Sequence, residues 1–214
     1  TGSSFSLNAE LQSEEVIMSS CVRGFSGILC IPVLFLFFAL QARASEQTPE
    51  SVLWQALQHG DHFAMLRHAL APGIGDPQNF VVGDCSTQRN LSETGRQQAQ
   101  RIGDRFRANG IEQAEVFTSQ WCRCLDTAEL LGLGAVTELP VLNSFFRNFE
   151  RETTQTDELK RWLDLHDNDM PLVLVTHQVN ITAMTGVFPD SGELVIVHRE
   201  ADGGFSVAGT VQTE

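Results

Sequence analysis

The sequence is poor in basic residues, with 14 Lys and Arg against 27 Asp and Glu in 214 residues, for a formal net charge of −13. Such an acidic chain disfavours nucleic acid and anionic membranes as partners, because both are negatively charged. If the substrate is a phosphate ester, a local cluster of arginines must override this field. The length is sufficient for one domain with a substantial core, and no internal repeat or low-complexity segment interrupts it.

The sequence also lacks the common metal-binding motifs. It contains no His-Glu-x-x-His, no Cys-x-x-Cys and no carboxylate cluster at metal-ligand spacing. We therefore predict no metal and no other cofactor. Four histidines (His59, His62, His166 and His198) fall at the ends of expected helices and strands, and we assign them no chemical role.

The apolar run at residues 28–40 has 13 residues, which is short of the ~20 that a membrane-spanning helix needs. It follows Arg23 and precedes Ala42-Arg43-Ala44, which is the pattern of a secretory signal peptide with a cleavage site before Ser45. The alternative is an uncleaved membrane anchor. The pattern predicts a periplasmic or secreted protein that is not stably inserted in the membrane.

Residues 1–17 show no convincing periodicity and precede Met18, the more natural start. They are explained by a cloning remnant or by translation from upstream. We expect residues 1–44 to be these upstream residues plus the signal peptide, and residues 45–214 to form a single domain. Three of the 27 acidic residues and two of the 14 basic residues lie in residues 1–44. Residues 45–214 therefore carry 24 acidic and 12 basic side chains, for a net charge of −12.

Two of the five cysteines, Cys21 and Cys30, lie in the expected leader. Cys85, Cys122 and Cys124 remain, and one disulfide is expected in an oxidising compartment. Cys122 and Cys124 are too close in sequence to pair comfortably, which favours a bridge from Cys85 to one of them. The alternative is three buried free thiols.

Three short segments with the character of strands are followed by residues that can bind or attack a phosphate. Residues 63–66 are followed by Arg67-His68, residues 115–118 by a polar stretch that reaches Arg123, and residues 172–176 by His177. Runs of this length are typical of buried strands. In open α/β sheets the carboxyl ends of the strands form the ligand site, so these ends are candidates for one phosphate site.

Helical spacing surrounds these strands. We expect helices at 49–59, 92–109, 123–132, 157–166 and 178–185, and further strands at 135–139, 194–198 and 204–208. Residues 71–91 form a loop rich in Gly, Pro and Asp, and a loop of that length next to Arg67-His68 favours a functional role. Phe145, Phe146 and Phe149 could form a lid or pack under the sheet, and we expect packing.

Four segments, in this order, resemble the histidine phosphatase superfamily, which includes cofactor-dependent phosphoglycerate mutase and periplasmic acid phosphatases. They are LRHA at 66–69, LSETGRQQA at 91–99, SQWCRCLDTA at 119–128 and THQVNITAMTG at 176–186. The resemblance covers residues 63–197. It implies an α/β fold, a three-layer sandwich with a central, mostly parallel sheet and helices on both faces.

The resemblance implies that His68 is the nucleophile and that Arg67, Arg123 and His177 hold the phosphoryl group. An imidazole nitrogen can attack phosphorus without a metal, and the phosphohistidine is labile enough for water to complete the cycle. His68 must be neutral, with its other N–H held by an acceptor such as a backbone carbonyl. The resemblance thus implies a metal-independent phosphomonoester hydrolase acting on a small or glycan-linked phosphate.

The general acid of the family is missing from its usual places. Gln178 stands where acid phosphatases of the group have an Asp, and Ser144 where the mutase-like branch has a Glu. Glu150 and Glu152, which lie slightly further on, are our candidates for the catalytic acid, with Asp84 in the long loop as another option.

Two further features bear on the site. Ala69 stands where the family has Gly, a change that a small residue satisfies, and Arg89 is a candidate for binding the rest of the substrate. Two alternative functions remain open at this point. One is a phosphomutase of the same family, disfavoured by the expected export and the missing acid. The other is a non-catalytic phosphate-binding or interaction module.

Overall fold

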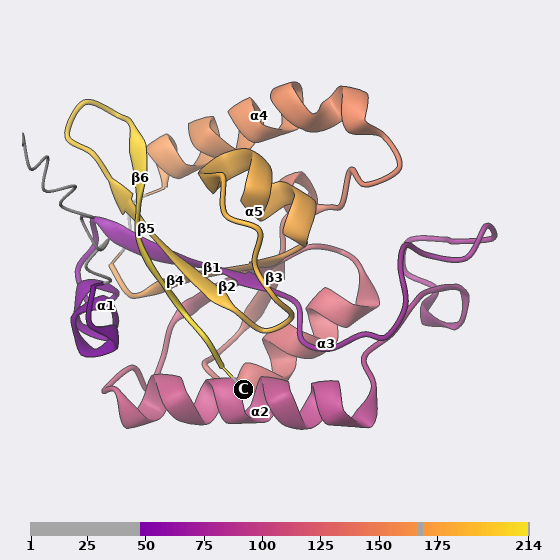
Figure 1. Cartoon of the computed structure of the whole chain (residues 1–214), viewed down its shortest axis with the longest axis horizontal. Coiled ribbons are helices and arrows are strands. Elements are labelled where there is room, and N and C mark those ends of the chain that lie inside the picture. The colour runs from indigo at the N-terminus through magenta and orange to yellow at the C-terminus, as the bar shows by residue number, and fades with distance from the viewer. Residues whose placement is uncertain (1–47, 167–168, 214) are drawn as a thin grey trace, which may run out of the picture. The chain divides into compact units, whose positions relative to one another are not determined.

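A computed structural model describes residues 48–166 and 169–213. Its centre is a six-stranded mixed sheet in the order β3-β2-β4-β1-β5-β6 (Figure 1). The strands are β1 (His62–Arg67), β2 (Glu115–Thr118), β3 (Val136–Glu138), β4 (Leu172–Thr176), β5 (Leu194–Arg199) and β6 (Phe205–Val211). The first four in sheet order pair in parallel, whereas β5 is antiparallel to both β1 and β6. The predicted central, mostly parallel sheet is therefore confirmed.

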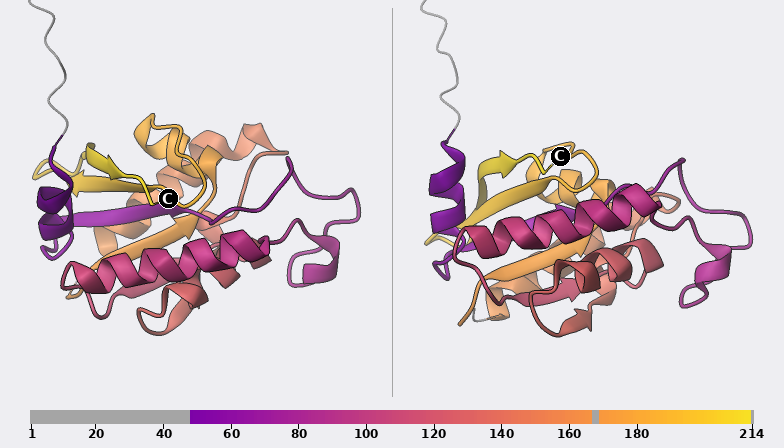
Figure 2. Two further views of the ribbon diagram at one scale, coloured as in Figure 1. Left: turned by 60° about the horizontal axis from the view of Figure 1, so that its bottom comes forward. Right: turned by 90° about the horizontal axis from the view of Figure 1, so that it is seen from below.

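Helices cover both faces of this sheet, as expected for a three-layer sandwich (Figure 2). The helices are α1 (Glu50–Ala56), α2 (Glu93–Ala108), α3 (Cys122–Leu131), α4 (Glu152–Leu165) and α5 (Gln178–Thr185), with short 3-10 turns η1 (Cys85–Thr87), η2 (Pro140–Leu142) and η3 (Phe149–Arg151). Side chains of α1, α2 and α3 pack with Ala64 and Leu66 on one face. Side chains of α4 and α5 pack with Phe63 and Met65 on the other.

The central strands are apolar along their whole length because both of their faces are covered. All five residues of β4 are buried, as are the four inner residues of β1. This is the pattern of parallel strands sandwiched between helices. Full burial of one side chain such as Phe63 contributes about 1.5–3 kcal/mol, so the two strands anchor the core on which the site stands.

The helix boundaries follow local chemistry. The hydroxyl of Ser92 accepts a hydrogen bond from the Gly95 N–H (3.0 Å) and begins α2, as the sequence predicts. Gly132, at φ 63°, ends α3 in the left-handed conformation. α4 begins at Glu152, whereas the sequence predicted a start at residue 157. The first turn of α4 is polar and has no apolar period, so the sequence pattern did not reveal it.

Three phenylalanines of the segment before α4 have different surroundings. Phe145 is buried, with 1% of its surface exposed, whereas Phe146 and Phe149 are 42% and 56% exposed. The prediction that they pack under the sheet is confirmed for Phe145 and is wrong for the other two. Sequence periodicity could not separate them, because this segment has no regular secondary structure except a short turn.

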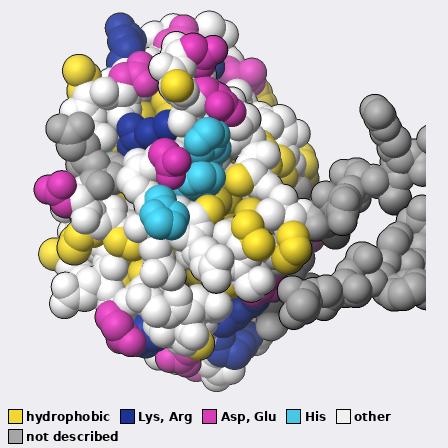
Figure 3. Space-filling view, turned by 90° about the vertical axis from the view of Figure 1, so that its left-hand side faces the viewer, with side chains coloured by type: hydrophobic (Ala, Val, Ile, Leu, Met, Phe, Trp, Pro, Cys, Tyr) yellow, Lys and Arg dark blue, Asp and Glu magenta, His cyan; other side chains and the backbone are white. Residues whose placement is uncertain are grey.

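Of the four remaining histidines, His62 begins β1 and His166 directly follows α4, as expected, whereas His59 lies between α1 and β1 and His198 is the second-last residue of β5. His62 and His198 are paired across β1 and β5, and histidine side chains gather on the face of the molecule that Figure 3 shows. His166 ends α4, and its Nε2 lies 2.7 Å from Oε2 of Glu115. None of the helices in the described part of the chain combines the length and the apolar character that a bilayer crossing requires. The expected leader lies outside the described residues.

Candidate active site

The carboxyl ends of three neighbouring parallel strands bring the expected residues together. β1, β4 and β2 lie side by side, so the residues that follow them meet at one edge of the sheet. Arg123 Nε lies 3.1 Å from His68 Nε2, and Arg123 Nη2 lies 3.4 Å from His177 Nδ1. The two imidazole rings are 5.6 Å apart, centroid to centroid. The predicted convergence of these side chains is confirmed.

His68 is held in one tautomer. Its side chain is buried, and Nδ1 lies 2.8 Å from the carbonyl oxygen of Ala69. Because a carbonyl oxygen only accepts, Nδ1 carries the proton and Nε2 keeps its lone pair. Burial lowers the pKa of His68 well below its usual value of 6.5, and the positive charge of Arg123 lowers it further. His68 therefore presents a neutral, basic nitrogen, as the family resemblance implied.

His177 stands at the end of β4 and caps the start of α5. Its Nε2 lies 2.8 Å from the hydroxyl of Ser119, and its Nδ1 accepts from Arg123. Burial lowers the pKa of His177 well below 6.5, and the positive charge of Arg123 lowers it further. The thiol of Cys124 is also buried, 3.5 Å from Nε2, and burial raises its pKa to about 12, so it stays protonated and uncharged.

One N–H donor of the Arg67 guanidinium has no hydrogen-bond partner among the described residues. Its Nη1 donates to the carbonyl of Pro189 (2.8 Å), while its Nε is buried and has no hydrogen-bond partner among the described residues. Burial lowers the pKa of this guanidinium, but an arginine stays charged at neutral pH. A buried N–H without a partner costs about 1–3 kcal/mol, which an oxyanion bound beside it would recover.

Arg123 already holds a carboxylate. Its Nη1 lies 2.7 Å from Oδ1 of Asp76 and its Nη2 3.3 Å from Oδ2, so the guanidinium grips both oxygens. Asp76 also accepts from the indole N–H of Trp121 (3.0 Å) and the Arg89 backbone N–H (3.2 Å). Burial raises the pKa of Asp76, but the bond and charge of Arg123 and the other donors outweigh this and lower it.

Asp76 is the site residue that sequence reasoning missed. It lies in the 71–91 loop, which was expected to be functional. The available signal was only that the loop follows the Arg67-His68 pair, and nothing in its spacing singles out this Asp from Asp84.

Arg89 lies in the same pocket, as predicted, but its guanidinium faces the loop's own backbone. Its Nε donates to the carbonyl of Gly75 (2.8 Å) and its Nη1 to that of Ala71. Burial and, to a smaller extent, the positive charge of Arg123 lower the pKa of Arg89 to about 10. These bonds fold the loop around Asp76. The predicted role of Arg89 in binding substrate stays a prediction.

Residues of the second and third motifs fix the backbone just after His68. The Ala69 N–H donates to the hydroxyl of Thr127 (3.0 Å), and the Leu70 N–H donates to Oε1 of Gln98 (2.9 Å). A Cβ added to Gly95 would lie 2.0 Å from the carbonyl oxygen of Leu70. α2 and α3 therefore hold the nucleophile's segment closely.

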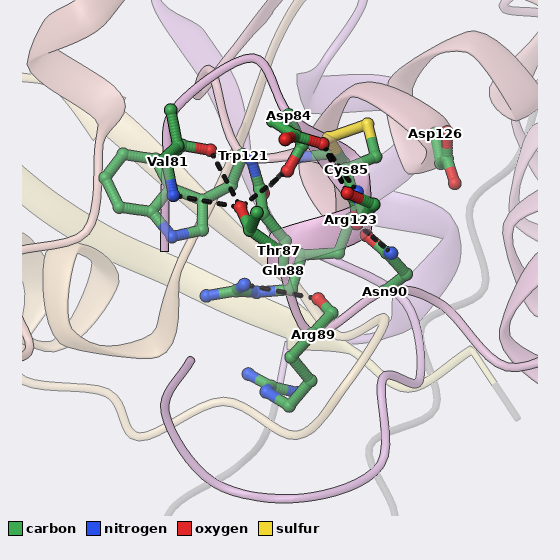
Figure 4. Close-up of a disulfide and its surroundings, with 12 residues drawn as sticks. Val81, Asp84, Cys85, Thr87, Gln88, Arg89, Asn90, Trp121, Arg123 and Asp126 are labelled. Carbon is green, nitrogen blue, oxygen red and sulfur yellow. Dashed lines mark hydrogen bonds between the residues drawn. A yellow bond between two sulfur atoms is a disulfide. The ribbon is translucent and has the colours of Figure 1, made fainter. Parts of the chain in front are cut away.

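A disulfide ties the 71–91 loop to the start of α3. It joins Cys85 to Cys122, directly before Arg123, and leaves Cys124 free (Figure 4). The side chain of Gln88 adds a second tie, because its Oε1 accepts from the Cys122 N–H (2.9 Å). Of the alternatives left by the sequence, the bridge from Cys85 is confirmed with Cys122 as its partner.

These residues surround a pocket of about 420 Å³. Its polar part is made by Arg67, His68, Asp76, Arg89, Arg123 and His177. Arg147, Asn148 and Arg151 also line it. Aromatic rings add apolar surface: Phe80 stacks on Trp121 with ring centroids 4.8 Å apart, and Phe146 and Phe188 are 42% and 72% exposed. The pocket therefore combines several arginines with flat apolar surfaces.

Asp76 is the only carboxylate that lines this pocket within residues 48–166 and 169–213. Glu150 and Glu152, the expected acids, are exposed and do not line it. Asp84 instead accepts from the Ser86 N–H (3.0 Å) and caps η1. Of these four carboxylates, Asp76 is the one that lines the pocket.

Comparison with known structures supports the same fold. A phosphoserine phosphatase of Entamoeba histolytica, solved with 3-phosphoglyceric acid, aligns with a TM-score of 0.51 at 13% identity, over 72% of this chain and 98% of its own. A mycobacterial glucosyl-3-phosphoglycerate phosphatase with inorganic phosphate aligns with a TM-score of 0.51 at 17% identity, over 72% of this chain and 97% of its own. The protein histidine phosphatase SixA with tungstate aligns with a TM-score of 0.50 at 12% identity, over 71% of this chain and 97% of its own.

No curated protein sequence matches the chain. Residues 65–162, however, match the model of the histidine phosphatase superfamily, branch 1. The matched residues include His68, Arg123 and the motifs that hold them. By this match, residues 65–162 are similar to the histidine phosphatase superfamily, and the chain shares the fold of the solved phosphatases above.

Proposed function

We propose that this protein is a phosphomonoester hydrolase that works through a phosphohistidine at His68 and needs no metal for the reaction. The observation that carries the proposal is the fixed tautomer of His68. Its Nδ1 proton is held by the Ala69 carbonyl, and its Nε2 points to Arg123 (3.1 Å) at the floor of the pocket. This is the geometry of an imidazole nucleophile beside a phosphoryl cradle.

In the first step, Nε2 of His68 attacks the phosphorus atom, the N–P bond forms, and the P–O bond to the leaving group breaks. Charge on the three non-bridging oxygens is met by the unpartnered Nε of Arg67 and by the guanidinium of Arg123. His177, which contacts Arg123, completes the cradle. Phosphoryl transfer depends mostly on such positioning and electrostatic stabilisation.

Asp76 supplies the proton for the leaving oxygen. Without substrate its carboxylate occupies the Arg123 guanidinium. A phosphoryl group that binds there displaces Asp76 and places negative charge beside it, which raises the pKa of a carboxyl group and favours its protonated form. Asp76 then donates its proton to the leaving oxygen. In the second step it takes a proton from water, the water oxygen bonds to phosphorus, and the N–P bond breaks.

For the substrate we propose a small or glycan-linked phosphomonoester. The exposed rings of Phe146 and Phe188 and the stacked pair of Phe80 and Trp121 offer flat apolar surfaces to the organic part of the ester. Sugar and aromatic rings both present such faces. The acidic surface of the chain further disfavours polyanionic substrates such as nucleic acid.

The test compares an aryl phosphate, p-nitrophenyl phosphate, with an alkyl phosphate, both in the presence of EDTA. An aryl leaving group needs no acid, whereas an alkoxide does. Hydrolysis of both esters is expected. The matched control is His166→Gln, which removes a histidine far from the pocket and is expected to leave both rates unchanged. Loss of both activities in EDTA would contradict the metal-independent mechanism.

A non-catalytic phosphate-binding module is the second candidate. It is favoured by Gln178 and Ser144, which line the pocket and stand at the two positions where the family resemblance implies an acid. The same experiment separates the two: binding of inorganic phosphate without hydrolysis of either ester would identify a binding module.

We further propose that the protein is exported, with cleavage between Ala44 and Ser45. The signal-peptide pattern supports this, and so does the Cys85–Cys122 disulfide, because disulfides persist in oxidising compartments. Expression of the full chain in a Gram-negative host, followed by cell fractionation and N-terminal sequencing, tests it. A mature periplasmic chain that begins at Ser45 is expected, and an uncleaved cytoplasmic chain would contradict it.

A further inference from the structure

At the end of the sheet where β1 begins, opposite to His68, three potential metal ligands lie together. They are Asp61, His62 and His198, and the ligand atoms that they offer all lie within 4.8 Å of one another. His62 begins β1 and His198 lies near the end of the antiparallel β5, so the two histidines are far apart in sequence but adjacent in the sheet. Figure 3 shows histidine side chains gathered beside an acidic side chain on this face.

The strand register fixes the two imidazoles. The Arg199 N–H donates to the Asp61 carbonyl (2.7 Å), so Asp61 and Arg199 form a hydrogen-bonded pair. The next pair, His62 and His198, is then of the non-hydrogen-bonded type, in which the side chains approach most closely. Their ring centroids are 4.6 Å apart and the planes meet at 31°. Two donors on paired strands are held in place before any ligand arrives.

Asp61 lies between the two rings. Its Oδ1 is 2.7 Å from Nδ1 of His62, and its Oδ2 is 3.7 Å from Nε2 of His198. A tetrahedral ion with bonds of about 2.0–2.2 Å needs donors about 3.3 Å apart, and the two measured separations lie on either side of that value. The Asp61 side chain is 57% exposed, against 18% for His62, so the carboxylate is free to adjust to an ion.

A second carboxylate supports His198 from behind. Nδ1 of His198 lies 3.3 Å from Oε1 of Glu200, and the same oxygen accepts from the hydroxyl of Ser206 (2.5 Å). In metal sites the ligating imidazole typically donates its other N–H to a carboxylate, which fixes the tautomer and raises the basicity of the ligand. Glu200 leaves Nε2 of His198 as the free donor, on the side of Asp61.

We propose that this cluster binds one divalent first-row transition-metal ion, with Zn²⁺ as the best match. The ligands are Nδ1 of His62, Nε2 of His198 and a carboxylate oxygen of Asp61, with water in the fourth position. Two imidazoles and one carboxylate form a donor set that Zn²⁺ favours. The ion displaces the proton between His62 and Asp61 and links β1 to β5. It lies away from the pocket and takes no part in the proposed hydrolysis.

A simple ion pair is the ordinary alternative, and the chain offers an example for comparison. His166 and Glu115 are 2.7 Å apart, but this pair has one histidine and one carboxylate. Among the described residues, only Asp61, His62 and His198 form a group of three. His166→Gln is therefore a matched control, since it removes a half-buried histidine paired with a carboxylate and leaves the cluster intact.

The test titrates Zn²⁺ into the full chain, stripped with EDTA and dialysed, by isothermal titration calorimetry, and follows Co²⁺ binding by visible absorption. One site per chain is expected, together with a higher melting temperature. Both His62→Gln and His198→Gln are expected to weaken binding of either ion by at least about tenfold, as is the milder Glu200→Gln. His166→Gln should bind as the wild type does.

Far-UV circular dichroism and hydrolysis of p-nitrophenyl phosphate show that each variant is folded, because none of them touches the pocket. Absence of Zn²⁺ binding would overturn the proposal. So would binding that survives both cluster variants, since the ion would then sit elsewhere, or binding that His166→Gln weakens equally.

Discussion

The carboxylate of Asp76 lies in the fork of the Arg123 guanidinium, with Oδ1 2.7 Å from Nη1. The Arg123 side chain is 3% exposed and that of Asp76 11%. In the proposed mechanism, substrate and Asp76 compete for this buried cation. This competition links substrate binding to the protonation of the acid, and the first prediction follows from it.

Asp76→Asn removes the proton donor and keeps the shape. Hydrolysis of an alkyl phosphate should fall by about 10²–10⁴-fold, the usual contribution of a general acid, while that of p-nitrophenyl phosphate should change much less. Steady-state kinetics on both esters measure the difference. Asp84→Asn, which changes the exposed carboxylate of the same loop, should change neither rate. An equal loss on both esters would show that Asp76 acts as a structural partner of Arg123 only.

Arg67→Lys tests the buried Nε without a partner. Lysine keeps the charge but cannot place a planar N–H donor beside the phosphoryl oxygens. Loss of such a donor costs about 3–4 kcal/mol of transition-state stabilisation, so kcat should fall by two to three orders of magnitude. Arg101→Lys, at an exposed position on α2, serves as the control. A kcat close to that of the wild type would exclude Arg67 Nε from the cradle.

Acid should destabilise the fold before it protonates the carboxylates. Burial lowers the pKa of His68 and of His177 below 6.5 in the folded chain. Below pH 6.5 these two histidines therefore bind more protons in the unfolded chain than in the folded chain. The free energy of unfolding should then decrease by up to about 1.4 kcal/mol per pH unit for each histidine, until pH reaches the folded pKa.

Urea unfolding between about pH 7.5 and about pH 5 measures this slope. Asp76 contributes at lower pH, because its lowered pKa gives stability that is lost only as pH falls below 3.8. The double variant His68→Asn, His177→Asn should show a shallower slope than the wild type. An identical slope in the double variant would mean that these two histidines protonate freely in the folded state.

Gly95→Ala should destabilise the protein because its Cβ would lie 2.0 Å from the Leu70 carbonyl oxygen. Overpacking of this kind costs about 1–3 kcal/mol, and the shift of Leu70 should also reduce the rate of hydrolysis. Thr94→Ala, an exposed neighbour on α2, should stay within about 0.5 kcal/mol of the wild type. Denaturant unfolding compares the two variants. Equal stability would show that α2 can move away from Leu70 without cost.

The residues at strand ends could be predicted because their signal is local. Arg67-His68, Arg123 and His177 each follow a short apolar run, and parallel pairing of the runs brings them to one edge. Phe145 illustrates the opposite case. Its burial beside the exposed Phe146 depends on how an irregular segment lies against the sheet, and no periodicity records this.

Asp76 and the cluster of Asp61, His62 and His198 escaped sequence reasoning for a related reason. Asp76 is placed by bonds to Arg123 and Trp121, which come from a distant segment, and by the Arg89 N–H of its own loop. His62 meets His198 only through the antiparallel register of β1 and β5. Both groups depend on long-range pairing, whereas the metal-binding and catalytic motifs of a sequence have short, fixed spacings.

Trapping of the covalent intermediate tests the central claim most directly. The full chain is mixed with a ³²P-labelled phosphomonoester, quenched in alkali, where phosphohistidine survives, and mapped by mass spectrometry. The account predicts a phosphoryl group on Nε2 of His68, and none in a folded His68→Asn variant that still binds phosphate. Rapid turnover with label on another residue, or with unchanged activity in His68→Asn, would contradict it.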